Sequence, residues 1–152
     1  MSNAQNPPAP QRVLVAVDGS DESKKAAKAA IRIAKYNKST LTVLHIRELP
    51  VGFADSEVIA ESKATEESHE SDVEKVIDDL VRSAQTEGVK ANKVIRQHEK
   101  SVLQTILDYA EKERIDLIVV GTKGLGGFKK MLLGSVASGL TNYARCSVLI
   151  VR

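Results

Sequence analysis

The sequence predicts an α/β protein with a single five-stranded parallel sheet and helices on both faces of that sheet. Two observations lead to this prediction. Five short runs are almost continuously apolar, as strands buried on both faces are, whereas strands with one wet face alternate. Segments with helical spacing or helix-start signals separate the runs, so the element order is βαβαβαβαβ, which is typical of parallel sheets.

The apolar runs are the expected strands. They occupy residues 12–17, 41–46, 93–97, 116–120 and 147–151. The run at 93–97 has the weakest apolar pattern, so we expect that strand to lie near an edge of the sheet.

The segments between the strands contain the expected helices, at 21–36, around 73–84, from 102 onward and at 135–145. Ser20 is a suitable N-cap for the first helix. Apolar residues at i, i+3, i+4 and i+7 from Val73 mark the second, after a stretch at 47–60 that we expect to be irregular. Ser101 opens a capping box that starts the third.

The length of 152 residues fits one domain, which we place at 12–152. Residues 1–11 hold three of the four prolines and are expected to be a disordered lead-in. The net charge of +2 is too small to indicate a nucleic-acid or membrane-surface partner. The single Cys146 is interpreted as an apolar filler, and no apolar segment reaches the ~20 residues of a membrane span. We therefore expect a cytoplasmic protein.

Two segments that follow strands carry the candidate chemistry, because ligands of open parallel sheets bind beyond the carboxyl ends of strands where the strand order reverses. The first is Asp18 with the turn after it, and the second is the glycine-rich loop from Gly121 to Gly134. Glycines leave backbone N–H groups open to an anion, and Ser135 then begins a helix whose free N–H groups suit phosphate.

These residues alone leave alternatives open. The loop fits neither the Walker A pattern nor GxGxxG, so a phosphate-binding loop competes with a merely flexible one. Asp18 suits a ribose hydroxyl or a divalent metal, but it also suits a turn that caps its own backbone. We interpret His45, inside a strand, as a hydrogen-bonded core histidine and not as a catalytic base.

The spacing Gly121-x2-Gly124-x9-Gly134-Ser135 resembles the G-2x-G-9x-G-(S/T) signature of the ATP-binding branch of the universal stress protein family. The opening RVLVAVDGSDESKKAA and the closing GTKGLGGFKKMLLGSVASGLTNYARCSVLIV are similar to the two ends of that family's domain. The resemblance implies a Rossmann-like fold, adenine nucleotide alpha hydrolase-like, with strand order 3-2-1-4-5.

The resemblance also implies a nucleotide site. Adenine and ribose would lie near Ala16, Val17 and Asp18, with Leu41 of the second strand as the adenine wall. The ribose and α-phosphate would be lined by Val120, Gly121, Lys123 and Gly124. The β- and γ-phosphates, bridged by Mg²⁺ or Mn²⁺, would lie against Gly134, Ser135, Val136 and Ala137.

The function expected on this basis is an ATP-binding regulatory module in a stress response, with a protein partner that the sequence does not identify. The loop shows neither a clear base nor an arginine finger, so a slow ATP hydrolase is the alternative and a dedicated enzyme is not expected. A dimeric interaction protein that binds AMP, cyclic AMP or no nucleotide is the other. The apolar last strand predicts a homodimer, which is also the family's common arrangement.

Overall fold

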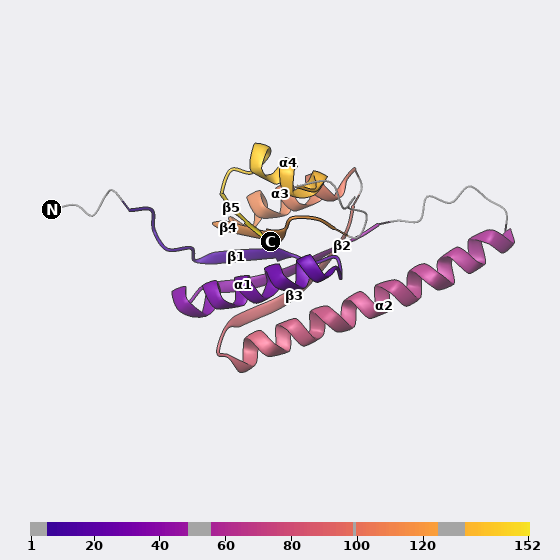
Figure 1. The fold of residues 1–152 in the computed structure, drawn as a ribbon, viewed down its shortest axis with the longest axis horizontal. Helices are drawn as coiled ribbons and strands as arrows, with labels where there is room; N and C mark the ends of the chain where they lie inside the picture. The colour runs from indigo at the N-terminus through magenta and orange to yellow at the C-terminus, as the bar shows by residue number, and fades with distance from the viewer. Residues whose placement is uncertain (1–5, 49–55, 99, 125–132) are drawn as a thin grey trace.

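The fold is an open parallel sheet, seen in the computed structural model, which describes residues 6–48, 56–98, 100–124 and 133–152 (Figure 1). The sheet has five strands in the order β3-β2-β1-β4-β5, and each neighbouring pair is parallel. The strands are β1 (Arg12–Ala16), β2 (Thr40–Arg47), β3 (Lys90–Gln97), β4 (Leu117–Gly121) and β5 (Ser147–Val151). The predicted fold class, strand order and edge position of the third strand are confirmed.

Four helices connect the strands in the described parts of the chain: α1 (Asp21–Asn37), α2 (Ser56–Thr86), α3 (Val102–Lys112) and α4 (Ser135–Tyr143). The first two cover one face of the sheet, and α3 and α4 cover the other (Figure 1). Ser20 and Ser101 cap α1 and α3, each accepting a hydrogen bond from the backbone N–H three residues on, as the sequence predicts.

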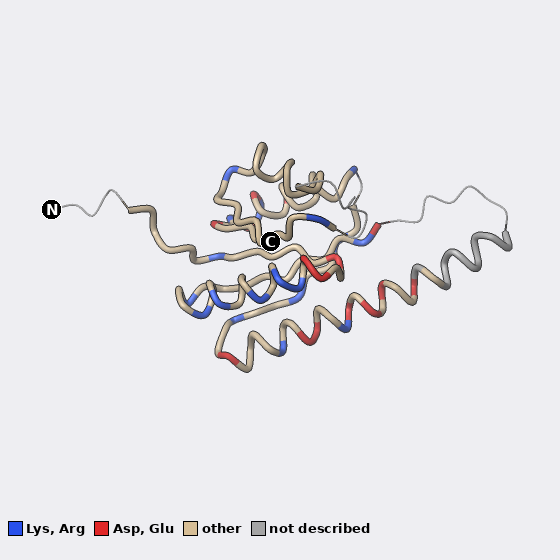
Figure 2. The backbone as a smooth tube through the Cα atoms, viewed as in Figure 1, with Lys and Arg blue, Asp and Glu red and all other residues tan. Residues whose placement is uncertain are grey.

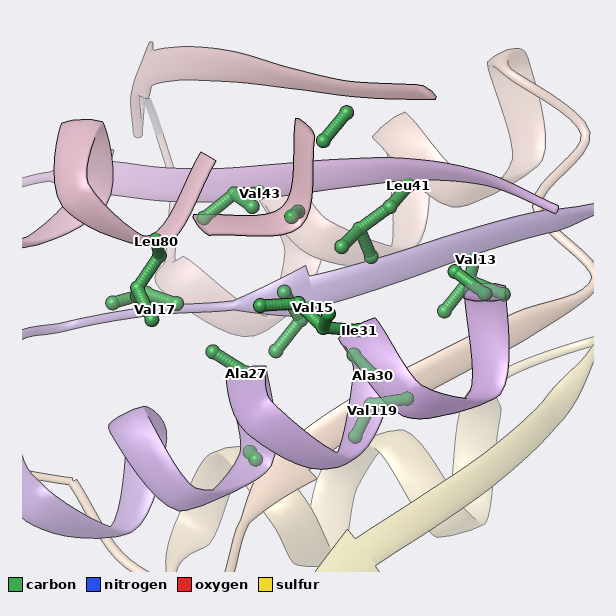
Figure 3. Packing of buried hydrophobic residues seen from close by; sticks show 14 of the residues in the cluster. Val13, Val15, Val17, Ala27, Ala30, Ile31, Leu41, Val43, Leu80 and Val119 are labelled. Carbon is green, nitrogen blue, oxygen red and sulfur yellow. The ribbon is translucent and has the colours of Figure 1, made fainter. Parts of the chain in front are cut away.

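Each face of the sheet has its own hydrophobic core because successive side chains of a strand point to opposite sides. Val13, Val15 and Val17 pack with α1 and α2 in the first core (Figure 3). Leu14, between them in sequence, packs in the second core, against α3 and α4. The central strands are therefore apolar on both sides, which is why they appear in the sequence as continuous runs.

Helices α3 and α4 lie in close contact at Gly139. A Cβ atom at this glycine would collide with the side chain of Leu103 on α3.

Cys146 packs against the second core, where burial raises the pKa of its thiol, in keeping with its interpretation as a filler.

The second helix is the main difference from the expected elements. It begins at Ser56, within the stretch at 47–60 that was expected to be irregular, and residues 49–55 lie outside the described residues. Residues 61–72 are polar except for Ala64, and acidic residues recur along the helix (Figure 2), so no apolar stripe marks this part of α2. Periodicity becomes visible only from Val73, where the helix meets the sheet.

The segment that we expect to be a disordered lead-in, residues 1–11, includes two residues that contact the sheet. Residues 1–5 of this segment lie outside the described residues. Pro10 and Gln11 are held against the sheet, since Ser39 Oγ donates to the Pro10 carbonyl at 2.6 Å and Gln11 N donates to Asp116 Oδ2 at 2.8 Å.

Among the described helices, none is long and apolar enough to cross a membrane.

Truncating Ile77 tests the packing of α2 on the sheet. Its side chain is fully buried in the first core. We expect Ile77→Ala to lower the free energy of unfolding by about 2–5 kcal/mol in urea titrations, because it removes buried methyl groups and leaves a cavity. Lys75→Ala, at an exposed position of the same helix, should change it by less than about 0.5 kcal/mol. Equal effects would mean that α2 is not packed as described.

Candidate functional site

The order of the sheet brings the two predicted segments together. Strand β1 is hydrogen-bonded to β2 on one side and to β4 on the other. After β1 the chain enters α1 on one face, whereas after β4 it leads to α4 on the opposite face. The carboxyl ends of β1 and β4 are thus the point where the strand order reverses, which is where open parallel sheets bind ligands.

Asp18 shapes the turn that follows β1. Its Oδ1 accepts hydrogen bonds from Ser20 N at 2.9 Å and from Ser20 Oγ at 2.6 Å, while the Ser20 hydroxyl oxygen accepts from Ser23 N at 3.2 Å. Gly19 has a φ of +90°, and a Cβ there would lie 2.9 Å from Val73 Cγ2. The turn-forming role of Asp18 is therefore real, and it fixes the position of the second carboxylate oxygen.

That second oxygen faces the exit of β4. A Cβ atom on Gly124 would lie 2.6 Å from Asp18 Oδ2, so the glycine backbone lies directly against the carboxylate. Gly134 packs on the same stretch, since its Cβ would lie 3.1 Å from the Thr122 carbonyl oxygen and 3.3 Å from Lys123 Cα. Gly134 N also donates to Thr122 O at 2.5 Å. Asp18, Gly124 and Gly134 therefore form one continuous surface, while residues 125–132 lie outside the described residues.

Helix α4 begins at this surface, with Gly134 as its N-cap residue. In the described part of the chain Gly134 makes no side-chain cap hydrogen bond, in contrast to the serines that cap α1 and α3. Its backbone carbonyl accepts from Ser138 N at 2.9 Å, so the N–H groups of the first turn have no carbonyl partner within the helix. Such a helix start attracts an anion through these N–H groups and through the helix dipole.

The other predicted residues differ in what they can contact. Ser135 is exposed at the start of α4, and Ala16, Lys123 and Val136 are partly buried. Val120 and Ala137 are 4% and 3% exposed and support the surface from the second core. Val17 is buried on the other face, and its N–H donates to Leu44 O at 2.9 Å. Val17 therefore positions its neighbour Asp18.

Leu41 is not part of this site, and the prediction of an adenine wall there is wrong. It pairs with Val13 near the amino end of β2, whereas the proposed site lies at the carboxyl ends of the strands. Its side chain is fully buried in the first core. At the carboxyl end of β2 the residue on the second-core face is Ile46, which is 8% exposed. Hydrophobicity alone could not distinguish the two ends of an apolar strand.

Comparison with known proteins agrees with the fold and extends it. A model of the universal stress protein family matches residues 10–152. The chain belongs to the universal stress protein family. Universal stress protein YxiE of Bacillus subtilis is 35% identical over 147 residues, covering 93% of this chain and 98% of that protein. Universal stress protein A homolog 1 of Coxiella burnetii is also 35% identical, over 144 residues, with 93% and 95% covered.

Solved structures of the family share the fold. Universal stress protein UspA from Lactobacillus plantarum has a TM-score of 0.82 at 23% identity, covering 97% of this chain and 100% of its own. A universal stress protein in complex with cAMP has a TM-score of 0.71 at 22% identity, with 95% and 99% covered. The protein from Archaeoglobus fulgidus in complex with dAMP has a TM-score of 0.61 at 21% identity, with 93% and 98% covered.

The glycines of the site give a test of its geometry. A Cβ at Gly121 would lie 2.8 Å from the backbone carbon of Glu22, so Gly121→Ala must displace the start of α1. We expect a loss of about 1–3 kcal/mol in the free energy of unfolding without ligand. Gly124→Ala meets only the end of the Asp18 side chain and should cost markedly less. Equal losses in urea titrations would contradict this arrangement.

Proposed function

We propose that this chain is an ATP-binding regulatory module whose nucleotide lies across the carboxyl ends of β1 and β4. The observation that carries the proposal is the uncapped start of α4, packed through Gly134 against the stretch that also touches Asp18. An anion-binding helix start and a carboxylate on one surface suit a nucleotide, which presents phosphates and ribose hydroxyls together.

Different residues of the site suit the phosphates, the ribose and the base of the nucleotide. The backbone N–H groups at the start of α4 and the Ser135 hydroxyl suit the outer phosphates. Lys123 lies in the chain directly before Gly124, which contacts the Asp18 carboxylate, and its Cα also lies close to Gly134. Asp18 Oδ2 suits a ribose hydroxyl. Ala16, which packs against the second core, and Ile46 offer apolar contact for the base in place of Leu41.

The site is compatible with a Mg²⁺ or Mn²⁺ ion that the nucleotide itself holds. Within the described ranges, no group of three or more His, Cys, Asp or Glu side chains is placed to bind a metal. Mg²⁺ commonly takes one or two carboxylates together with phosphate oxygens and water, and Asp18 offers a carboxylate oxygen against Gly124. The ion would neutralise phosphate charge beside that carboxylate.

Regulation is favoured over rapid hydrolysis. Hydrolysis needs a base or orienting group for water and a positive charge for the transition state. Asp18 Oδ1 is engaged by Ser20, and His45 is 4% exposed with both ring nitrogens in contact. Slow ATP turnover remains the second candidate function, supported by the proposed phosphate contacts alone.

An adenine nucleotide with fewer phosphates is the alternative ligand. Two structural neighbours are in complex with cAMP and dAMP, and each of these ligands has a single phosphate. They support adenine nucleotides as the class of ligand for this fold. We favour ATP here because the N–H groups at the start of α4, which Gly134 and Ser135 begin, are suited to phosphates beyond the first.

We expect calorimetric titration with ATP and Mg²⁺ to show binding, and Ser135→Ala to weaken it by about tenfold or more through loss of one hydrogen bond to a charged group. Gly134→Val should abolish binding, because its side chain crowds Thr122 and covers the helix start. Ser138→Ala, one turn further along α4, is the matched control and should bind as the wild type does.

Parallel titrations with AMP and cyclic AMP decide between the ligands. Tighter binding of ATP supports a cradle for the outer phosphates, whereas tighter binding of AMP or cyclic AMP favours the alternative. Absence of binding by any of them in the folded wild type would contradict the proposed function and favour an interaction protein without nucleotide.

We also propose that two copies pair through β5. One edge of this strand is bonded to β4, and its other edge has no strand partner in the described part of the chain. Its sequence, SVLIV, carries no charge, and Leu149 is 37% exposed. The opposite edge strand, β3, carries Lys90, Lys93 and Arg96, which discourage edge pairing. A regulatory module of this kind could present its ligand state to a partner through the paired surface.

Light scattering at micromolar concentration should give the mass of a dimer. Leu149→Lys should shift it to the monomer by placing a charge on the apolar edge, while Asn92→Lys on the exposed face of β3 should leave the dimer intact. A monomeric wild type, or equal effects of the two variants, would contradict pairing through β5.

A further inference from the structure

His45 joins three elements beneath the proposed site. It lies in β2 and is 4% exposed, with its side chain on the face covered by α2. Its Nδ1 lies 2.8 Å from the carbonyl oxygen of Val17, the residue before Asp18. Its Nε2 lies 2.8 Å from Glu70 Oε2 on α2. One ring therefore connects the end of β1, the second strand and the second helix.

The two contacts fix the orientation of the ring. The Val17 carbonyl can only accept, so Nδ1 must donate to it. Nε2 lies against a carboxyl oxygen of Glu70, so the ring is held between a carbonyl and a carboxyl group.

Further charges surround this contact. Arg47, two residues along β2, has its Nε 3.5 Å from Glu70 Oε2, and its guanidinium also pairs with Glu74. From the end of β3, His98 N donates to the Arg47 carbonyl oxygen at 3.3 Å. Glu70 is thus faced by both His45 and Arg47, so it retains a cationic partner if the imidazole is removed.

The contact to Val17 has a consequence for Asp18. The Val17 N–H continues the sheet ladder through Leu44 O, but β1 ends at Ala16, and the Val17 carbonyl is satisfied by His45. Holding this carbonyl fixes the orientation of the peptide plane that leads into Asp18. Buried ion pairs contribute little net stability compared with apolar packing, whereas they do select one geometry in some proteins.

We propose that His45 is a positioning residue for the nucleotide site: its ring, oriented by the Glu70 carboxylate, bonds the Val17 carbonyl and so fixes the orientation of Asp18. The inference rests on the proposed nucleotide binding and adds a role to a residue that touches no ligand.

Three variants separate the two contacts of the ring. His45→Phe removes both. His45→Asn retains an amide N–H near the position of Nδ1 and so can keep the bond to Val17, but it is too short for Glu70. Glu70→Gln can donate its amide N–H to Nε2 of a ring that is protonated at Nδ1, so it keeps both contacts. Glu67→Gln, at an exposed position of α2, is the matched control.

We expect His45→Phe to raise the Kd for ATP about tenfold, as the loss of one hydrogen bond that orients Asp18 would. His45→Asn should restore the Kd to within about threefold of the wild type, although both variants lose stability in urea. Glu70→Gln and Glu67→Gln should bind with the wild-type Kd. Rescue by asparagine distinguishes positioning from a general loss of packing.

Nitrogen NMR of the histidine rings gives a second readout that does not depend on nucleotide. Nδ1 of His45 should have the shift of a protonated nitrogen in the wild type, because it donates to the Val17 carbonyl. In Glu70→Gln the Nδ1 shift should be unchanged. His69, exposed on α2, serves as the internal reference. An unprotonated Nδ1 in the wild type would overturn the positioning role.

The binding outcomes separate this inference from the proposed function. If the wild type binds ATP and His45→Phe binds equally well, the positioning role is wrong while nucleotide binding stands. If His45→Asn and His45→Phe are weakened to the same degree, His45 has a structural role only, and the inference is overturned. If the wild type binds no nucleotide, the proposed function fails and the positioning role fails with it.

Discussion

The whole site depends on the contact between the Asp18 carboxylate and the backbone of Gly124. It joins the exits of β1 and β4, which lead to helices on opposite faces of the sheet. Each partner is fixed independently: Asp18 by Ser20, and the stretch before Gly124 by the hydrogen bond from Gly134 N to Thr122 O. A rigid junction of this kind holds a ligand surface at one geometry before the ligand arrives, which lowers the entropic cost of binding.

Much of this architecture is visible in the sequence because burial on both faces of a parallel sheet leaves a strong pattern. Val13 to Val17 contribute to both cores in alternation, so the run has no polar positions to disguise it. The caps at Ser20 and Ser101 obey local chemistry and were predicted for the same reason. The signature glycines likewise point to a site, and the structure packs two of them, Gly124 and Gly134, on one stretch.

The features that could not be predicted depend on contacts between distant segments. An apolar strand does not reveal which of its residues lies at the exit, so Leu41 and Ile46 could not be told apart. The polar part of α2 lacks an apolar stripe and left the helix start hidden. His45 was correctly interpreted as a bonded core residue, but its partners, Val17 and Glu70, are 28 and 25 residues away.

The packing at Gly139 has a mechanical consequence. At Gly139 the backbone of α4 lies against the Leu103 side chain of α3, so α4 cannot approach α3 at this point unless that side chain moves. The other end of α4 carries the exposed Tyr143 ring, and just beyond it Arg145 pairs with Glu111 of α3, where Nη1 and Oε1 are 2.9 Å apart. A displacement of α4 toward α3 at Gly139 must therefore be shared with α3, to which the chain after α4 is also joined by this ion pair.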